Sequence, residues 1–435
     1  QLKTEGLSDL IKNNYFDLNY ALYIPKTEKI AEKMAPESSV YYLYGEDVES
    51  LNPTSTDPEK DTKQGSIKWV SLKSQFFSAG LIANSAFDAL SVNSEPWDKE
   101  QNDRRNYVKK LETFAQIPFQ RSGVDTFGIL LYYGPNDHYA MKKYEVNFEK
   151  SLNLGWGPTR YFNQYIVLPV FKTLETFTSN YGLVIFILAI VIRLLLSPMT
   201  YKMHLSSAKM KIVNELPEIK ALDEKYANDP TRLQTEKMAY YTQIGVSPFA
   251  GCLPLLLQIP ILFALFSFFP SSIDLRQKSF LWADDLSTYD SIWDFGVVPV
   301  INFIYGDHVS LFALLMTITT LITTWLQQQN QGNSPQAQQM KYIGYIFPVI
   351  FLSILNNYSA GLSYYYFVAN VLTIGQTYLM RALVSETKIA DQIHAMKNKR
   401  KNEPEKKSKF QKWMEEQQKA QREMAAIKDK DKKKK

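Results

Sequence analysis

Long apolar runs are confined to the later part of the chain. Before about residue 155 no apolar stretch is long enough to cross a bilayer, whereas after it such stretches recur up to residue 384. The pattern predicts five helical membrane spans, at residues 181–198, 249–269, 309–326, 342–357 and 361–380. The first span has 18 residues and, at about 1.5 Å per residue, reaches roughly 27 Å, close to the thickness of the hydrocarbon core.

This pattern leaves two other interpretations open. The fourth and fifth runs are joined by the polar, turn-forming stretch "LNNYSAG", so they could form one buried hairpin instead of two spans. A soluble protein is the alternative to a membrane protein, although core helices seldom run this long without charge.

Basic residues orient the predicted spans. The connection at residues 199–248 carries seven Lys and Arg residues, whereas the one at 270–308 carries only Arg276 and Lys278. Because cytoplasmic loops are enriched in Lys and Arg, the first connection is expected in the cytoplasm. Five spans then deliver the basic segment at residues 385–435 to the cytoplasm and leave residues 1–155 outside it.

The outer domain, residues 1–155, has the pattern of a β-sandwich. Short aromatic and β-branched runs such as "SVYYLYG", "IKWVSLKSQFF" and "TFGILLYYGP" alternate with turn-forming clusters such as "LNPTSTDPEKD". No phosphate-binding loop, metal-ligand spacing or nucleophile motif is found there. The domain is therefore expected either to bind a partner or to serve as a spacer that stabilises the protein.

An amphipathic helix is predicted at residues 156–180, between the outer domain and the first span. Pro158 suits a first helical turn. Apolar and aromatic residues recur every three or four positions, at Tyr161, Tyr165, Leu168, Phe171, Leu174 and Phe177. This pattern is typical of a helix lying in the membrane interface, and a soluble core helix is the alternative.

The cytoplasmic connection is predicted to form a helical hairpin at residues 203–247. Two helical patterns are separated by "NDPT", where Asp229 or Thr231 suits the cap of the second helix. The hairpin is expected either to receive substrate or to be a solvated connection without a partner.

Polar residues inside the spans point to a hydrated site. Arg193 interrupts the first span, and a charge at that depth costs at least a few kcal/mol unless it faces protein, water or a ligand. Its side chain could also reach the cytoplasmic headgroups, because Arg193 precedes Pro198 by only about 7 Å of helix. Polar stripes on other spans favour a wet cavity, and they comprise Gln258; Thr317, Thr320 and Thr324; and Tyr366, Asn370, Thr373 and Thr377.

Composition argues against metal, thiol and acid–base chemistry. Cys252 is the single cysteine and the four histidines lie far apart in the sequence, so a metal site is not expected. The interiors of the spans contain no Asp, Glu or His, which disfavours a membrane enzyme. A secondary transporter would use an intramembrane arginine, but the inverted repeats typical of that class are not seen.

Four motifs, in order, closely resemble the YidC family of membrane protein insertases. Between Trp156 and Arg381 they read "YGLVIFILAIVIRLLLSPMTYK", "SPFAGCLPLLLQIPILFALFSFF", "IDLRQKSFLWADDLSTYD" and "IFPVIFLSILNNYSAGLSYYYFVANVLTIGQ". The outer domain resembles the periplasmic β-sandwich of Gram-negative members through "GSIKWVSLKSQFFSAGLI" and "LYYGP". The family also has an N-terminal anchor span, so a chain that begins "QLKTEGL" is expected to be part of a longer precursor.

The resemblance implies a hydrophilic groove open to the cytoplasm and to lipid but closed outside. Its residues here would be Arg193, Gln258, Thr317, Thr320, Tyr366, Asn370 and Thr373. The exit path into lipid would run along Phe263 and Tyr365. Members often carry a hydroxyl residue one turn before the arginine, where this chain has Ala189.

The resemblance thus implies a multi-pass inner-membrane protein with an insertase core at residues 181–384. It would insert and help fold nascent membrane proteins, alone or with the Sec translocon, without enzymatic chemistry or a cofactor. From Arg381 onward, eighteen basic and nine acidic residues give a net charge of 18 − 9 = +9. Three alternatives fit this tail: it binds anionic lipid headgroups, it binds ribosomal RNA, or it contacts only solvent. The resemblance favours the ribosome.

Overall fold

The computed structural model describes most of the chain. It covers residues 2–5, 12–97, 106–120, 124–227, 229–244, 246, 253–296, 298, 301–329, 335–385, 387, 389–393 and 395. The chain divides into two compact units. Unit 1 comprises residues 1–189, 259–316 and 351–368, and unit 2 comprises residues 190–258, 317–350 and 369–435.

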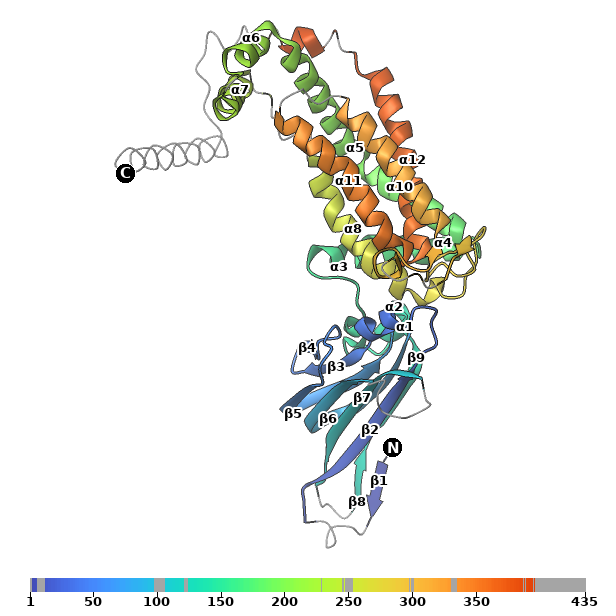
Figure 1. The fold of residues 1–435 in the computed structure, drawn as a ribbon. Helices are drawn as coiled ribbons and strands as arrows, with labels where there is room; N and C mark the ends of the chain where they lie inside the picture. Colours follow the sequence, from blue (N-terminus) through green and yellow to red (C-terminus); the bar gives the residue numbers. More distant parts are fainter. Residues whose placement is uncertain are drawn as a thin grey trace, which may run out of the picture. The chain divides into compact units, whose positions relative to one another are not determined.

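A seven-stranded antiparallel sheet dominates the first part of unit 1 (Figure 1). Six strands follow the order β2-β7-β6-β5-β3-β4, and β9 pairs with β6. Their bounds are β2 Tyr15–Pro25, β3 Ser39–Tyr44, β4 Asp47–Ser50, β5 Glu59–Lys73, β6 Phe77–Pro96, β7 Tyr107–Pro118 and β9 Ile129–Pro135. A separate pair joins β1 (Leu2–Glu5) to β8 (Val124–Phe127). The strands predicted for the N-terminal part of the chain are therefore confirmed as a sheet-rich region.

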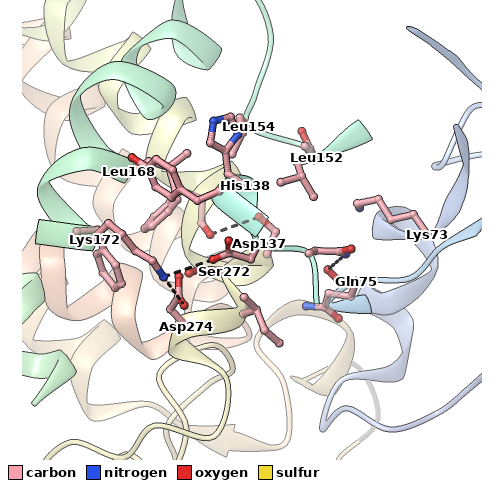
Figure 2. Close-up of a pocket in the computed structure, with 17 residues that line it drawn as sticks. Lys73, Gln75, Asp137, His138, Leu152, Leu154, Leu168, Lys172, Ser272 and Asp274 are labelled. Atoms are coloured by element: carbon pink, nitrogen blue, oxygen red, sulfur yellow. Dashed lines mark hydrogen bonds and ion pairs between the residues drawn. The ribbon is translucent and has the colours of Figure 1, made fainter. Parts of the chain in front are cut away.

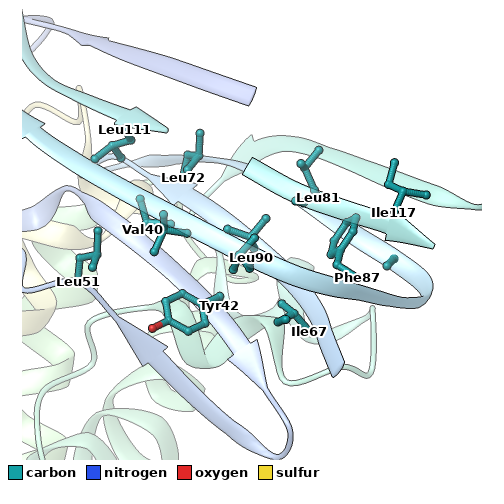
Figure 3. Packing of buried hydrophobic residues seen from close by; sticks show 14 of the residues in the cluster. Val40, Tyr42, Leu51, Ile67, Leu72, Leu81, Phe87, Leu90, Leu111 and Ile117 are labelled. Carbon is teal, nitrogen blue, oxygen red and sulfur yellow. The ribbon is translucent and has the colours of Figure 1, made fainter. Parts of the chain in front are cut away.

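Strand β6 changes partners along its length, and its pairing with β5 is irregular near the middle. The first half of β6 pairs with β9 and its second half pairs with β7, while the register of β5 against β6 shifts between Gln64 and Trp69. Side chains from β3 and β7, which are not neighbours in the sheet, meet in one apolar cluster, as Val40 and Leu111 show (Figure 3). Burial of this cluster stabilises the domain, because apolar area is removed from water.

Short helices lead from the sheet to the membrane region. They are α1 (Ala31–Met34), α2 (His138–Lys142), α3 (Pro158–Phe162) and α4 (Leu168–Glu175). Pro158 begins α3, as predicted, but a π turn at Asn163–Val167 separates α3 from α4. The predicted single apolar stripe is split, because the π turn changes the helical phase. Tyr161 and Tyr165 are exposed and stacked on each other, whereas Phe171 is buried.

Five long helices follow, at the places where the sequence predicts spans. They are α5 (Tyr181–Glu215), α8 (Leu253–Ser271), α10 (Leu311–Gln328), α11 (Pro335–Asn356) and α12 (Ala360–Leu383). Among the described residues, α5 and α10 are long and apolar enough to cross a membrane, and shorter apolar helices cover residues 258–271 and 342–356. The number of spans thus stays a prediction.

Pro198 lies inside α5 without ending the helix. A proline lacks the N–H that would bond the carbonyl of Leu194, four residues earlier. The hydroxyl of Ser197 donates to that carbonyl oxygen at 2.8 Å. Helix α5 therefore runs for 35 residues and forms the first arm of the connection at residues 199–248.

The rest of that connection folds as two helices, α6 (Pro217–Lys225) and α7 (Pro230–Ile244). Asp229 accepts from the N–H of Arg232 at 3.0 Å, which confirms Asp229 as a helix cap. An ion pair joins the two helices, with the Nζ atom of Lys237 at 2.6 Å from a carboxylate oxygen of Asp223. The connection shares an apolar core with two residues that follow α12, and this core comprises Val213, Leu216, Ile219, Tyr241, Ile244, Val246, Ile389 and Ile393.

Candidate functional site

Polar side chains of α10 and α12 meet inside unit 2. The buried amide of Asn370 donates to the hydroxyl of Thr320 at 2.8 Å and to that of Thr319 at 3.3 Å. Such bonds between membrane helices contribute only about 0.6 kcal/mol each to stability. A gain in stability alone therefore does not explain why these helices carry polar side chains. The contact shows that the two stripes predicted from the sequence face each other at this level.

The hydroxyls of α12 beyond Asn370 bond to their own helix. Thr373 donates to the carbonyl of Ala369 at 2.6 Å, and Thr377 donates to that of Thr373 at 2.8 Å. A hydroxyl that donates backward keeps its lone pairs available as acceptors. These positions can therefore take a hydrogen bond from water or from a substrate backbone.

Arg193 is half-buried on α5 and also belongs to unit 2. It follows the buried Ile192 and precedes Leu194 and Leu195, which are exposed. A half-buried guanidinium keeps its charge, because arginine cannot be deprotonated in proteins. It offers five N–H donors in a fixed fork, a geometry that suits carboxylates.

The remaining predicted site residues are divided between the units. Gln258 and Thr317 lie in unit 2 with Arg193, whereas Phe263, Tyr365 and Tyr366 lie in unit 1. Phe263 is 48% exposed, which fits a lipid-facing exit path. Tyr365 is buried among aromatic rings. The centre of its ring lies 6.0 Å from the ring centre of Phe269 and 5.2 Å from that of Tyr366.

Arg381 is a polar residue of this region that the sequence did not single out. Its guanidinium donates to the carbonyl of Leu326 at 3.0 Å and to the side chain of Gln329 at 3.1 Å. The last four carbonyls of a helix have no donor within the helix, so Arg381 caps α10 from α12. The sequence signal that could have identified this contact is a basic residue in the last turn of α12.

The polar groups of the spans form no metal site. Across the part of the chain that the structure describes, no group of three or more His, Cys, Asp or Glu side chains is arranged to hold an ion. The described helices carry a cation, hydroxyls and amides, which are groups that form hydrogen bonds and ion pairs.

Family models match two parts of the chain. The model for the 60Kd inner membrane protein matches residues 173–388, and that for the YidC periplasmic domain matches residues 21–168. One part is the sheet with the short helices that follow it, and the other begins within α4 and ends after α12.

Curated relatives match almost the whole chain. The membrane protein insertase YidC of Amoebophilus asiaticus is 39% identical over 414 residues, which are 94% of this chain and 66% of that protein. The membrane protein insertase YidC of Parabacteroides distasonis is 38% identical, and the match covers 88% of this chain and 60% of that protein. The membrane protein insertase YidC of Bacteroides fragilis is 36% identical, and the match covers 98% of this chain and 69% of that protein. The chain therefore spans about two thirds of the length of these relatives.

A solved structure is also similar, although the superposition is loose. The crystal structure of an active YidC insertase with its first transmembrane domain resolved has a TM-score of 0.37 and 19% identity. The match covers 83% of this chain and 79% of that one.

Proposed function

The chain belongs to the YidC family of membrane protein insertases, and on this premise we propose that it inserts integral membrane proteins and helps them fold. One observation carries the proposal beyond family membership. An otherwise apolar α5 holds a half-buried guanidinium, while amide–hydroxyl bonds join α10 and α12 within the same unit. Apolar spans gain little from such groups unless a polar chain or water uses them.

The proposed topology has five spans, at the ranges predicted from the sequence, in the bacterial inner membrane. The sheet-rich domain would be a periplasmic β-sandwich, and the segment at residues 156–180 would lie along the membrane interface. The basic connection of α5, α6 and α7 and the tail would face the cytoplasm. Seven Lys and Arg residues at positions 199–248 support this orientation.

The proposed groove comprises Arg193, Gln258, Thr317, Thr320, Tyr366, Asn370 and Thr373. A short acidic tail that enters it exchanges bulk water for groove water and for the guanidinium of Arg193. The cost of carrying the tail part-way across falls, because the charge is paired instead of facing hydrocarbon. Ala189, one turn before Arg193, is fully buried and supplies no hydroxyl at that level.

Transfer of the attached apolar segment into lipid supplies the driving force. Burying a span of about 20 apolar residues is favourable in proportion to its apolar area, so no covalent step and no nucleotide are required. The exposed ring of Phe263 is a surface along which such a segment can leave, and Tyr365 of the same unit is the second residue assigned to this path. The process is therefore not enzymatic and uses no cofactor.

The proposed partners are nascent membrane proteins, membrane lipids, the Sec translocon and the ribosome. Ribosome binding is assigned to the basic tail, whose residues 396–435 lie outside the described residues. Neutralisation of phosphates makes such binding salt-dependent. Deleting residues 397–435 should weaken co-sedimentation with ribosomes and leave insertion of short, post-translationally delivered substrates nearly unchanged; unaltered co-sedimentation would remove the tail from this role.

Reconstitution in liposomes tests the proposal. Purified protein should insert a short single-span protein with an acidic tail in the absence of ATP. Arg193→Ala should slow this insertion roughly tenfold or more, because a carboxylate in the groove loses its ionic partner. Arg193→Lys should retain part of the activity, since it keeps the charge but not the bidentate geometry.

Lys202→Ala is the matched control for the loss of charge. Lys202 lies on the same helix and is exposed, so its removal should leave insertion unchanged. Equal insertion by wild type and Arg193→Ala, at equal protein levels, would exclude the proposed role of the arginine for that substrate. Solute flux without protein insertion would favour a transporter.

A further inference from the structure

Lys172 of α4 lies among three carboxylates in unit 1, and Figure 2 shows two of them, Asp137 and Asp274. Its Nζ atom is 3.0 Å from an oxygen of Glu175, 3.4 Å from one of Asp137 and 3.5 Å from one of Asp274. The lysine side chain is 41% exposed, whereas those of the three acids are only 14%, 17% and 23% exposed in the same order. One partly exposed cation therefore neutralises a group of mostly buried anions.

The three carboxylates come from three different segments. Asp137 follows β9 and caps α2, since it accepts from the N–H of Ala140 at 2.6 Å. Glu175 is the last residue of α4. Asp274 lies in the 3-10 turn Ile273–Leu275, directly after the end of α8 at Ser271. Lys172 thus connects the sheet domain, the interfacial segment and the end of a predicted span.

A second polar contact joins the sheet domain to α8 beside this group. The buried side chain of Gln75 donates to the carbonyl of Pro270 at 2.8 Å. Gln75 and His138 line the small cavity next to Lys172. The two contacts approach α8 from neighbouring positions, so the end of this helix is held at more than one point.

Electrostatics shows that the charge of Lys172 holds the group together. Burial lowers the pKa of Lys172, but attraction to Asp274, Glu175 and Asp137 outweighs burial and raises the pKa above its ordinary value. The pKa of Asp274 is raised, first by burial and then by repulsion from Glu175, while Lys172 opposes the rise. Without the lysine, three like charges would face one another in a poorly solvated site.

We propose that Lys172 is a positioning residue for membrane insertion. It fixes α4 against the sheet domain and against the end of α8, and α5 begins only five residues after α4 ends, at Tyr181. Lys172 thereby fixes the approach to α5, which carries Arg193, and the end of α8, which carries Gln258. This inference rests on the insertase function proposed above.

The inference predicts an unusual pH dependence for a variant without the lysine. Protonation of the acids removes their mutual repulsion, so acid should relieve the defect that the missing cation causes. Other titratable or charged groups face Lys172 or its acidic partners, or line the adjoining cavity. These groups are Tyr139, Tyr181, Lys73, His138 and, against the ring of Tyr181, Lys278.

None of these other groups mimics the predicted response. Burial lowers the pKa of Lys73 and that of His138, and it does so in wild type and variant alike. Burial raises the pKa values of Tyr139 and Tyr181, so both tyrosines stay protonated at and below neutral pH. Comparing each variant with wild type at the same pH therefore isolates the acids around position 172.

The experiment measures insertion by the full chain in liposomes at pH 7.5 and at pH 5. Lys172→Met should insert roughly tenfold more slowly than wild type at pH 7.5, since truncating one partner of a partly buried charge group leaves the others unpaired. The deficit should shrink to about threefold or less at pH 5. Lys172→Arg should insert at nearly the wild-type rate, and Lys142→Met, at an exposed lysine of α2, is the control.

A double variant separates positioning from a general folding defect. Lys172→Met with Asp274→Asn removes one of the three acids and should regain most of the lost rate at pH 7.5. Wild-type insertion by Lys172→Met, or a loss that neither low pH nor Asp274→Asn relieves, would overturn the inference. Failure of the wild-type chain to insert would instead contradict the proposed function, so the two failures are distinguishable.

Discussion

The two ends of the same helices bury different kinds of side chain. In unit 1, α5 buries Val184, Leu188 and Ala189, and α10 buries Phe312 and Ala313. In unit 2 the continuations of these helices carry a half-buried arginine and a series of buried or half-buried threonines. The first region excludes water by close packing, and the second provides hydrogen bonds at membrane depth.

The same contrast runs along α12. Its first turns, in unit 1, pack aromatic rings, and the ring of Tyr364 lies 4.9 Å from that of Phe280 and 5.1 Å from that of Phe312. Two turns later, in unit 2, Asn370 bonds to the threonines of α10. In the proposed topology the apolar ends face outward and the polar ends face the cytoplasm. In this proposal, closure on one side and hydration on the other would be properties of different segments of the same helices.

The largest effect should follow from removing the helices at the polar end. Replacing residues 216–246 by a short Gly/Ser linker removes α6, α7 and most of their shared core with α5. Insertion should be abolished, because substrate is no longer received next to the groove. Protease protection and membrane fractionation should show that the remaining spans still reach the membrane. Normal insertion by this deletion would reduce the hairpin to a solvated connection.

A smaller effect should distinguish polar from apolar positions on a single face of α12. Asn370→Leu removes the amide that bonds to Thr319 and Thr320. Insertion should fall several-fold, while stability should change by less than about 1 kcal/mol, since such bonds contribute little to it. Insertion kinetics and thermal unfolding of the same preparations provide both numbers.

The control for Asn370→Leu lies seven residues earlier on α12. Ser363 is fully buried in unit 1, and Ser363→Ala should leave insertion within about twofold of wild type. Similar losses from the two variants would contradict a division between a polar and an apolar region.

The smallest effect on insertion should come from overpacking the apolar region. A Cβ atom at Gly182 would lie 2.1–2.3 Å from ring carbons of Phe280, closer than any real contact. Gly182→Ala should therefore destabilise the protein by about 1–3 kcal/mol and lower its thermal midpoint in detergent. Gly375→Ala is the control, since no heavy atom would lie within 4 Å of its Cβ. An unchanged midpoint for Gly182→Ala would show that this region is loosely packed.

Sequence periodicity predicted much of the polar site but not its contacts. Thr317, Thr320 and Asn370 were found because they recur on one face of otherwise apolar helices. Thr319, which also accepts from Asn370, falls off that three-residue repeat and was missed. The bonds of Arg381 were missed for another reason, because they join residues more than fifty positions apart.

Local patterns also failed where tertiary structure compensates for a rule. Pro198 lies inside α5, where the hydroxyl of Ser197 satisfies the carbonyl that the proline leaves without a donor. The π turn at Asn163–Val167 disrupts a regular apolar stripe, and the buried amide of Asn163 donates to the carbonyl of Ala264 on α8 at 2.6 Å. The arrangement around Lys172 needs three segments at once and has no local signature.

Site-specific crosslinking to a stalled nascent chain tests the central claim most directly. A photoreactive residue at Thr320, Thr373 or Gln258 should crosslink to the acidic tail of a single-span substrate, and Arg193→Ala should reduce the yield. The same probe at Leu188, Ala313 or Ser363, in the apolar region, should give little product. Equal yields from both sets of positions, or a yield that does not depend on Arg193, would contradict a polar groove confined to one end of these helices.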